Sequence, residues 1–327
     1  TFCLLVLTLT NLLSQGNSIT VDSGYADVDG GRLFYEVAGK GENIVLLHDG
    51  MVNHRIWDEQ FPVLAKNFRV VRYDRRGYGK STDPQTKYSH IDDLNQVFLQ
   101  LKVDKAVIFG MSSGGGLAIN FALTYPEKVN GLVLVGAVVS GFGYTSHMTT
   151  RGGHLNPAEM SDPVKLRKYF ILDDPYEIYS GNKKAKEKVM TLLPYFGRDN
   201  TVPTKPPVKI AVKYLSEIKV PTLILVGEYD HPDVHAHAGV INAGIENSRR
   251  EIIPKSGHLI PVARALALAE TLQMEGVEII PFAYPFDRDR DLLHLQIDKL
   301  ISRLGTTWEA ARDWKRRSST RFGSHTG

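Results

Sequence analysis

The stretch Gly110-Met111-Ser112-Ser113-Gly114 fits the pattern G-x-S-x-G, and its flanks decide how the chain folds. Residues 105–109 before it form a short apolar run with strand character. Residues 115–125 after it indicate a mostly apolar helix, which Pro126 ends. A serine on such a strand-to-helix turn has a strained backbone, and its hydroxyl projects above the edge of the sheet.

The same stretch favours chemistry at Ser112 over a plain loop. Glycines at both ends let strand and helix approach closely, because glycine adds no Cβ there. The helix begins beside Ser112, so its free N–H groups and positive dipole end face developing negative charge. A glycine-rich loop at a strand end is the alternative interpretation. The apolar strand and helix around the motif favour a nucleophilic serine instead.

Length and composition indicate a globular protein with a full core. The chain has 327 residues, of which 43% are hydrophobic and 23% charged, as in one large α/β domain with an insertion or in two domains. The formal net charge is +3, but residues 312–327 hold five basic residues and one acid, which leaves −1 for the rest. The body therefore has no basic field for nucleic acid, and we interpret the basic tail, 306–327, as a solvated, flexible end.

The N-terminal residues 1–20 are excluded from the predicted fold. Cys3 is the one cysteine, which excludes an intrachain disulfide and a cysteine-rich zinc site. The apolar run 2–13 is shorter than the roughly 20 residues that span a bilayer. Small residues at 14 and 16 precede a possible cleavage site, so we interpret the segment as a secretory signal. A secreted or periplasmic protein, not stably inserted in a membrane when mature, is expected; an ordinary N-terminal extension would leave it cytoplasmic.

The remaining pattern alternates strands and helices. Residues 24–38 predict a hairpin, and a helix capped by Ser89 follows the loop that ends at Ser81. Further strands are expected over 43–47, 129–136, 218–226 and 250–254, and a helix over 234–244. Residues 141–216 mix Gly, Pro, Tyr and Lys with helical pieces at 163–170 and 182–193, which indicates an insertion that covers the carboxyl edge of the sheet. We therefore expect a core of residues 21–140 and 217–305 around a lid, 141–216.

Three motifs together carry a family resemblance that covers about residues 24–260. They are His48-Asp49-Gly50 after a buried strand, with Trp57 nine residues beyond His48, then the stretch 70–81 (VVRYDRRGYGKS), then the serine turn. In this order they resemble the α/β-hydrolase superfamily, and within it the serine esterases and lactonases with a helical lid. The resemblance implies an α/β-hydrolase fold, with a mostly parallel central sheet flanked by helices. Many members have glycine where this chain has Asp49.

The resemblance also implies the site residues. Ser112, Asp230 and His258 follow three strands in the order nucleophile, acid, base. His258 would take the proton of Ser112, and Asp230 would hold the imidazole. Backbone N–H groups of Ser113 and Gly50, with Met51 as the neighbouring alternative, would form the oxyanion hole. The side chains expected to line the substrate pocket are those of Met51, Trp57 and Met111.

Each assignment has rivals in the sequence. Ser113 fails as nucleophile because Met111 stands where the turn needs glycine. Glu228 and Asp233 lie near Asp230, and His294, in a helix predicted over 291–304, competes with His258. Histidines and an acid crowd the chain after Asp230 (His231, Asp233, His235 and His237), but no distant ligand completes a metal set, so no metal and no cofactor is expected. The sequence gives no reason for the unit 276–305.

The expected function is a serine hydrolase that cleaves small-molecule carboxylic esters or lactones through an acyl-enzyme. An iminopeptidase, a hydrolase of C–C bonds or a perhydrolase would share the same residues. Serine at position 112 argues against dehalogenase or epoxide hydrolase chemistry, which in this superfamily uses aspartate there. A non-catalytic ligand-binding protein on the same fold is the alternative of another class. The chain does not reveal the oligomeric state.

Overall fold

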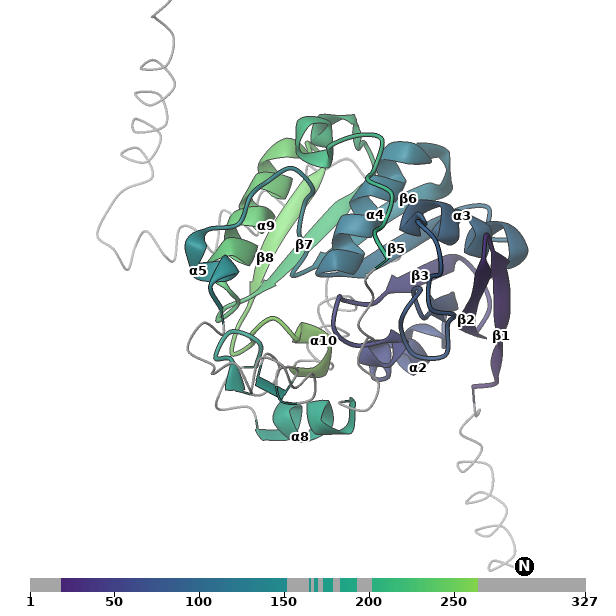
Figure 1. Ribbon diagram of the computed structural model, residues 1–327, viewed down its shortest axis with the longest axis horizontal. Helices are drawn as coiled ribbons and strands as arrows, with labels where there is room; N and C mark the ends of the chain where they lie inside the picture. The colour runs from purple at the N-terminus through teal and green to yellow at the C-terminus, as the bar shows by residue number, and fades with distance from the viewer. Residues whose placement is uncertain are drawn as a thin grey trace, which may run out of the picture. The chain divides into compact units, whose positions relative to one another are not determined.

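The computed structural model describes residues 19–151, 165, 168–169, 173–178, 183–192 and 202–263. Their centre is an eight-stranded sheet with the order β1-β2-β4-β3-β5-β6-β7-β8, which helices flank (Figure 1). All neighbouring strands from β4 to β8 in this order run parallel. The mostly parallel α/β architecture expected from the sequence is thus confirmed.

The first two strands form the predicted hairpin. β1 (Val21–Val28) pairs antiparallel with β2 (Gly31–Ala38), and Gly30 in the turn between them has a φ of 71°. Glycine tolerates this left-handed conformation without the steric cost of a Cβ. β2 then pairs antiparallel with β4 (Arg69–Tyr73), which joins the hairpin to one edge of the parallel sheet.

The parallel strands place five loops at one edge of the sheet. β3 (Asn43–Leu47), β5 (Ala106–Met111), β6 (Val129–Val135), β7 (Thr222–Gly227) and β8 (Ser248–Ile253) all run in one direction. Their carboxyl ends therefore meet at the same edge, where ligands bind in sheets of this kind. β7 begins later than predicted, because the residue before it is Pro221, which has no N–H for the ladder.

Helices cover the sheet and shield its apolar strands. α3 (His90–Gln100) begins at Ser89, whose side chain accepts a hydrogen bond from the Asp92 N–H, as predicted. α4 (Ser113–Thr124) packs on β5 and β6, and α9 (Pro232–Gly244) packs on β7 and β8. Shorter helices lie between these elements and after β8: η1 (His54–Trp57), α2 (Gln60–Leu64), η2 (Pro126–Lys128) and α10 (Ile260–Ala263). The core between helices and sheet is apolar, with Phe98 and Phe121 in contact at 4.9 Å between ring centroids.

The long connection from β6 to β7 leaves the sheet. Its described parts contain α5 (Ser146–Thr149), α8 (Lys183–Leu192), η5 (Ala211–Lys213) and η6 (Leu215–Glu217). α8 matches the helical piece predicted over 182–193 and packs against α10, beside which Figure 1 shows it. The insertion therefore contacts the segment that directly follows His258.

Several expectations fall on residues that the structure does not describe. The signal-like residues up to 18 and the helical piece 163–170 apart from 165 and 168–169 are among them. So are His294, the unit 276–305 and the tail 306–327. In the part of the chain that is described, no helix combines the length and apolar character needed to cross a membrane.

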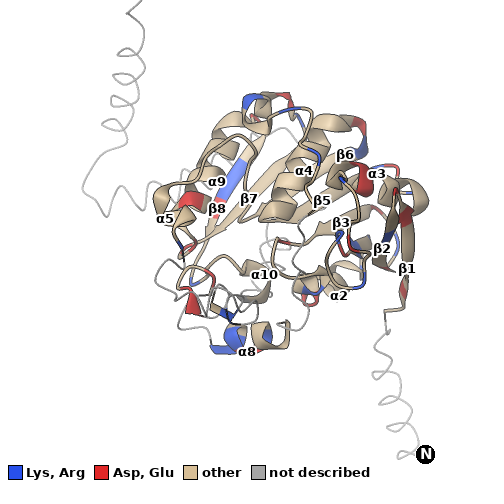
Figure 2. Cartoon of the chain, in the orientation of Figure 1, with Lys and Arg blue, Asp and Glu red and all other residues tan. Residues whose placement is uncertain are grey.

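Charges of both signs are spread over the described elements. Figure 2 shows Lys and Arg interspersed with Asp and Glu along the sheet and its helices. The basic residues of α8, Lys183, Lys184, Lys186 and Lys188, are exposed or half-buried, and Lys188 pairs with Glu59 at 3.0 Å. This distribution is that of a solvated surface without one dominant field.

Candidate active site

The turn after β5 holds Ser112 in a strained conformation. Ser112 has φ 52° and ψ −117°, a region that residues other than glycine rarely adopt, and α4 starts at the next residue. A Cβ on Gly110 would lie 2.5 Å from the Gly114 carbonyl oxygen, and one on Gly115 would lie 2.4 Å from the Ala137 Cβ. The prediction that small residues are needed because strand and helix approach closely is confirmed.

Asp230 and His258 form a buried acid–imidazole pair. Asp230 follows β7 and His258 follows β8, and they are 3% and 7% exposed. The His258 Nδ1 lies 3.0 and 3.1 Å from the two carboxylate oxygens of Asp230. An ionised carboxylate only accepts, so Nδ1 carries the hydrogen and Nε2 is left as the basic nitrogen.

Charges around His258 favour its protonated form. Burial alone would lower the pKa of His258, but the carboxylates of Asp230, Glu177 and Asp49 outweigh it and raise the pKa to about 9. The imidazolium is therefore stabilised in this site. Because its pKa is high, the neutral imidazole of His258 is a strong base. The same high pKa means that the imidazole loses its proton only in alkaline solution.

Ser112 and His258 lie on either side of the end of β6. The Ser112 N–H donates to the Val135 carbonyl at 2.9 Å. A Cβ on the next residue, Gly136, would lie 2.9 Å from both Cε1 and Nδ1 of His258 and 3.3 Å from Asp230 Oδ2. Within the described residues no hydrogen bond joins the Ser112 hydroxyl to His258. Hydrogen bonds between catalytic groups are often long in the absence of substrate. The Ser112 turn and the His258 ring both lie near the carboxyl end of β6.

The loop after β3 lies beside the serine turn and contains an N–H that makes no hydrogen bond within the described residues. The Asp49 carboxylate accepts from the N–H of Met51 at 3.2 Å and of Val52 at 2.9 Å. The Gly50 N–H donates to no group in the described chain, and the same holds for Ser113. A Cβ on Gly50 would lie 3.2 Å from Ser113 Oγ, so the two backbones are close. Of the two alternatives, Gly50 and not Met51 has the available donor.

Arginine and tyrosine from the segment after β4 hold this loop. Arg75 Nη2 donates to the Asp49 carbonyl and, at 3.0 Å, to Ser113 Oγ. Tyr78 donates its hydroxyl to the Gly50 carbonyl at 2.7 Å. Arg76 donates to Asp93 at 2.8 Å. Arg75 and Tyr78 therefore fix the loop after β3, and the Asp49 carboxylate stabilises the turn of the same loop.

The rival acids have other partners. Glu228 accepts from the Lys255 N–H at 2.8 Å, and Asp233 accepts from the Thr145 hydroxyl at 2.8 Å. His237 accepts from the Val139 N–H at 3.1 Å. Of the acids after β7, Asp230 is the one that contacts His258, so the geometry favours it over its neighbours.

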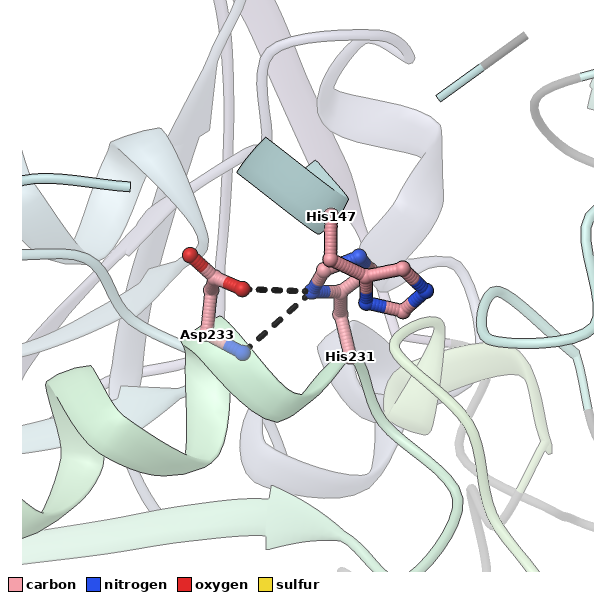
Figure 3. A group of neighbouring side chains, drawn as sticks. All are labelled: His147, His231 and Asp233. Carbon is pink, nitrogen blue, oxygen red and sulfur yellow. Dashed lines mark hydrogen bonds and ion pairs between the residues drawn. The ribbon is translucent and has the colours of Figure 1, made fainter. Parts of the chain in front are cut away.

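One group of described side chains is close enough to be considered for a metal: His147, His231 and Asp233 (Figure 3). Their ligand atoms lie within 4.8 Å of one another. The two imidazoles stack with 4.7 Å between their ring centroids and an interplanar angle of 28°. Asp233 is also bonded to Thr145 by both oxygens. The arrangement is that of a packed aromatic contact.

The proposed pocket residues differ in exposure. Met51 is half-buried, whereas Trp57 and Met111 have no exposed surface. Trp57 lies 6.5 Å from Phe109 between ring centroids, as expected of core packing. The role of all three in a pocket stays a prediction.

Three positions around His258 were missed by sequence reasoning. Gly136 could have been suspected, since it ends a buried strand at the edge where the site lies. Arg151 and Glu177 had no signal, because they belong to the insertion, whose path no local pattern predicts.

The fold and this edge of the sheet define a class that known proteins share. A family model described as alpha/beta hydrolase fold matches residues 43–174. The proline iminopeptidase of Saccharolobus solfataricus is 29% identical over 277 residues, which are 75% of this chain and 89% of that protein. Two solved structures are also similar. Est816, titled an N-acyl homoserine lactone degrading enzyme, has a TM-score of 0.64, 26% identity and coverage of 77% of this chain and 99% of that one. The esterase EaEST from Exiguobacterium antarcticum has a TM-score of 0.61, 26% identity and coverage of 77% and 97%.

The chain has the α/β-hydrolase fold, and the proteins of known structure to which it is similar include an esterase and a lactone-degrading enzyme.

Proposed function

We propose that this protein is a serine hydrolase that cleaves carboxylic esters or lactones through an acyl-enzyme. The observation that carries the proposal is the buried Asp230–His258 pair beside the strained turn of Ser112. The similarity to Est816 and to EaEST supports esters and lactones as the substrate class. Ser112 is the nucleophile, His258 the base and Asp230 the group that orients the base.

The reaction follows from these positions. His258 Nε2 takes the hydroxyl proton as Ser112 Oγ attacks the carbonyl carbon, and the oxyanion accepts from the N–H groups of Gly50 and Ser113. The imidazolium, stabilised by Asp230, then gives its proton to the leaving alkoxide, and the acyl group stays on Ser112. Water, deprotonated by the same imidazole, attacks the acyl-enzyme, and the imidazolium returns this proton to Ser112 Oγ as the bond to the acyl group breaks and the acid leaves. The enzyme returns to its starting state without a metal.

A fluorophosphonate probe tests the nucleophile. The wild type should be labelled, and Ser112→Ala should abolish both labelling and ester hydrolysis, with a loss on the order of a millionfold in kcat. Ser113→Ala is the matched control, since it keeps the backbone donor and the nucleophile and should still be labelled. A wild-type protein that does not react would favour a ligand-binding protein, and labelling that persists in Ser112→Ala would refute the assignment.

A substrate panel tests the reaction class. We expect p-nitrophenyl esters or lactones to be turned over faster than proline p-nitroanilide. The 29% identity to a proline iminopeptidase makes that activity the second candidate, and a reversed preference would select it. Activity should be unchanged by EDTA. Strong inhibition by the chelator would direct attention to His147, His231 and Asp233.

A further inference from the structure

A turn of the insertion lies against the loop that carries His258. The His258 N–H donates to the Tyr176 carbonyl at 2.8 Å, and the Leu259 N–H donates to the Glu177 carbonyl at 3.0 Å. A Cβ on Gly257 would lie 2.5 Å from the Tyr176 oxygen, so only glycine fits beside this turn. The backbone of the base is thus held by the insertion.

Arg151 fixes the shape of this turn. Its guanidinium donates to Asp174 through Nε and to Glu177 through Nη2, both at 2.8 Å. Asp174 also accepts from the Tyr176 N–H at 2.9 Å. Both carboxylates are 2% exposed. Charged groups so deeply buried hold their geometry strongly, because separating them would leave an unpaired charge inside the protein.

Only one of the two carboxylate oxygens of Glu177 is bonded to Arg151. Its Oε2 atom is buried and has no hydrogen-bond partner among the residues that the structure describes, whereas Oε1 accepts from Arg151. Burial raises the pKa of Glu177, and the positive charge of His258 is the largest influence that opposes it. The negative charge of Glu177 likewise raises the pKa of His258, and among the charges that do so its effect is second to that of Asp230. Asp230 after β7 and Glu177 from the insertion are therefore the two charges that most favour the imidazolium.

We propose that Glu177 is a positioning residue for His258, in a turn that Arg151 anchors. The turn holds the backbone of the base through two carbonyls, and the Glu177 carboxylate adds to Asp230 in stabilising the imidazolium. This inference rests on the proposed function, since it assigns Glu177 to the same reaction. The charged groups that face His258 from the packed elements are Asp230 after β7, Glu177 from the insertion and Asp49 after β3.

The test compares Glu177→Gln with Asp93→Asn. Both changes remove the charge of a buried carboxylate that pairs with an arginine, and Asp93 lies on α3, where it contacts Arg76 and not His258. Rates of fluorophosphonate labelling and of ester hydrolysis are measured against pH, and melting temperature is measured for each protein. Glu177→Gln should move the midpoint of the profile to lower pH by on the order of one unit. Its maximal kcat should fall about tenfold with KM nearly unchanged, because the base is less well placed. Asp93→Asn should lower the melting temperature alone.

Arg151 supplies a second, independent comparison. Arg151→Met should reduce kcat more than Arg151→Lys, which keeps the charge and rescues part of the rate. If Arg151→Met does not fold, the isosteric Glu177→Gln still decides. A Glu177→Gln profile that coincides with the wild type, in a protein labelled at Ser112, overturns the positioning role alone. A wild type that is never labelled overturns the proposed function instead.

Discussion

The two halves of the candidate site are held by different parts of the chain. The oxyanion half, around Gly50 and Ser113, is fixed by Arg75 and Tyr78, which come from the segment after β4 in the core. The base half is fixed on one side by Asp230 from the sheet and on the other by the carbonyls of Tyr176 and Glu177 from the insertion. The difference teaches that the insertion contacts the loop of the base through two backbone hydrogen bonds, whereas the contacts that hold Gly50 and Ser113 come from the core.

The largest effect is expected where the sheet holds the base. Asp230→Asn should lower kcat by about 10⁴-fold, because an amide no longer stabilises the imidazolium and can hold the wrong tautomer. Steady-state ester hydrolysis measures the loss. Asp233→Asn is the matched control from the same loop and should retain most activity, since Asp233 is bonded to Thr145. Equal losses in both variants would mean that the acid has been wrongly chosen.

A methyl group placed between the nucleophile and the base should also be costly. Gly136→Ala puts a Cβ 2.9 Å from the His258 ring at a φ of 53°. Displacement of the imidazole should lower kcat by about 100-fold. Gly143→Ala is the control, since a Cβ there meets nothing within 4 Å. A Gly136→Ala variant as active as Gly143→Ala would show that His258 is not needed at this place.

The dependence of kcat/KM on pH reports on the base half of the site, because it follows the charge on His258. The pKa of His258, raised to about 9, means that the free protein carries a protonated base at neutral pH. Because only the neutral imidazole accepts the serine proton, kcat/KM should fall about tenfold for each pH unit below this value. The dependence of kcat/KM on pH from 6 to 10 measures it. A profile already flat from pH 7 upward would contradict the charge environment of His258.

The smallest effect is expected in the oxyanion half. Tyr78→Phe removes one hydrogen bond to the Gly50 carbonyl, which is worth about 1 kcal/mol, so kcat should fall less than tenfold. The midpoint of the pH profile should not move, because the base half is untouched. Tyr125→Phe, on a ring that contacts Phe121, serves as a control for the loss of a hydroxyl. A shifted midpoint in Tyr78→Phe would show that the two halves are coupled after all.

Local patterns predicted the sheet and much of the site. The hairpin, the strand 43–47, the Ser89 cap and the helix after Ser112 depend on neighbouring residues, and the structure has all of them. Asp230 and His258 were placed by motif order, which is meaningful because parallel strands bring their carboxyl ends together. Their contact is observed, and their catalytic role remains a proposal.

Other features could not be foreseen from the sequence. The short helices η1 and α2 have too few residues for a periodic signal. Glu177 lies 81 residues before His258 in the chain, and their proximity depends on how the insertion returns to the sheet. The role of Asp49 became visible only through the hydrogen bonds that its carboxylate accepts from the N–H groups of Met51 and Val52.

The backbone conformation at Ser112 sets the thermal stability of the protein against its proposed activity. Its φ of 52° and ψ of −117° suit glycine far better than serine, so the native protein carries conformational strain at this one residue. Ser112→Gly should therefore melt about 2 °C or more above the wild type while having lost its nucleophile. Selection for stability alone would therefore replace the residue that we propose as the nucleophile.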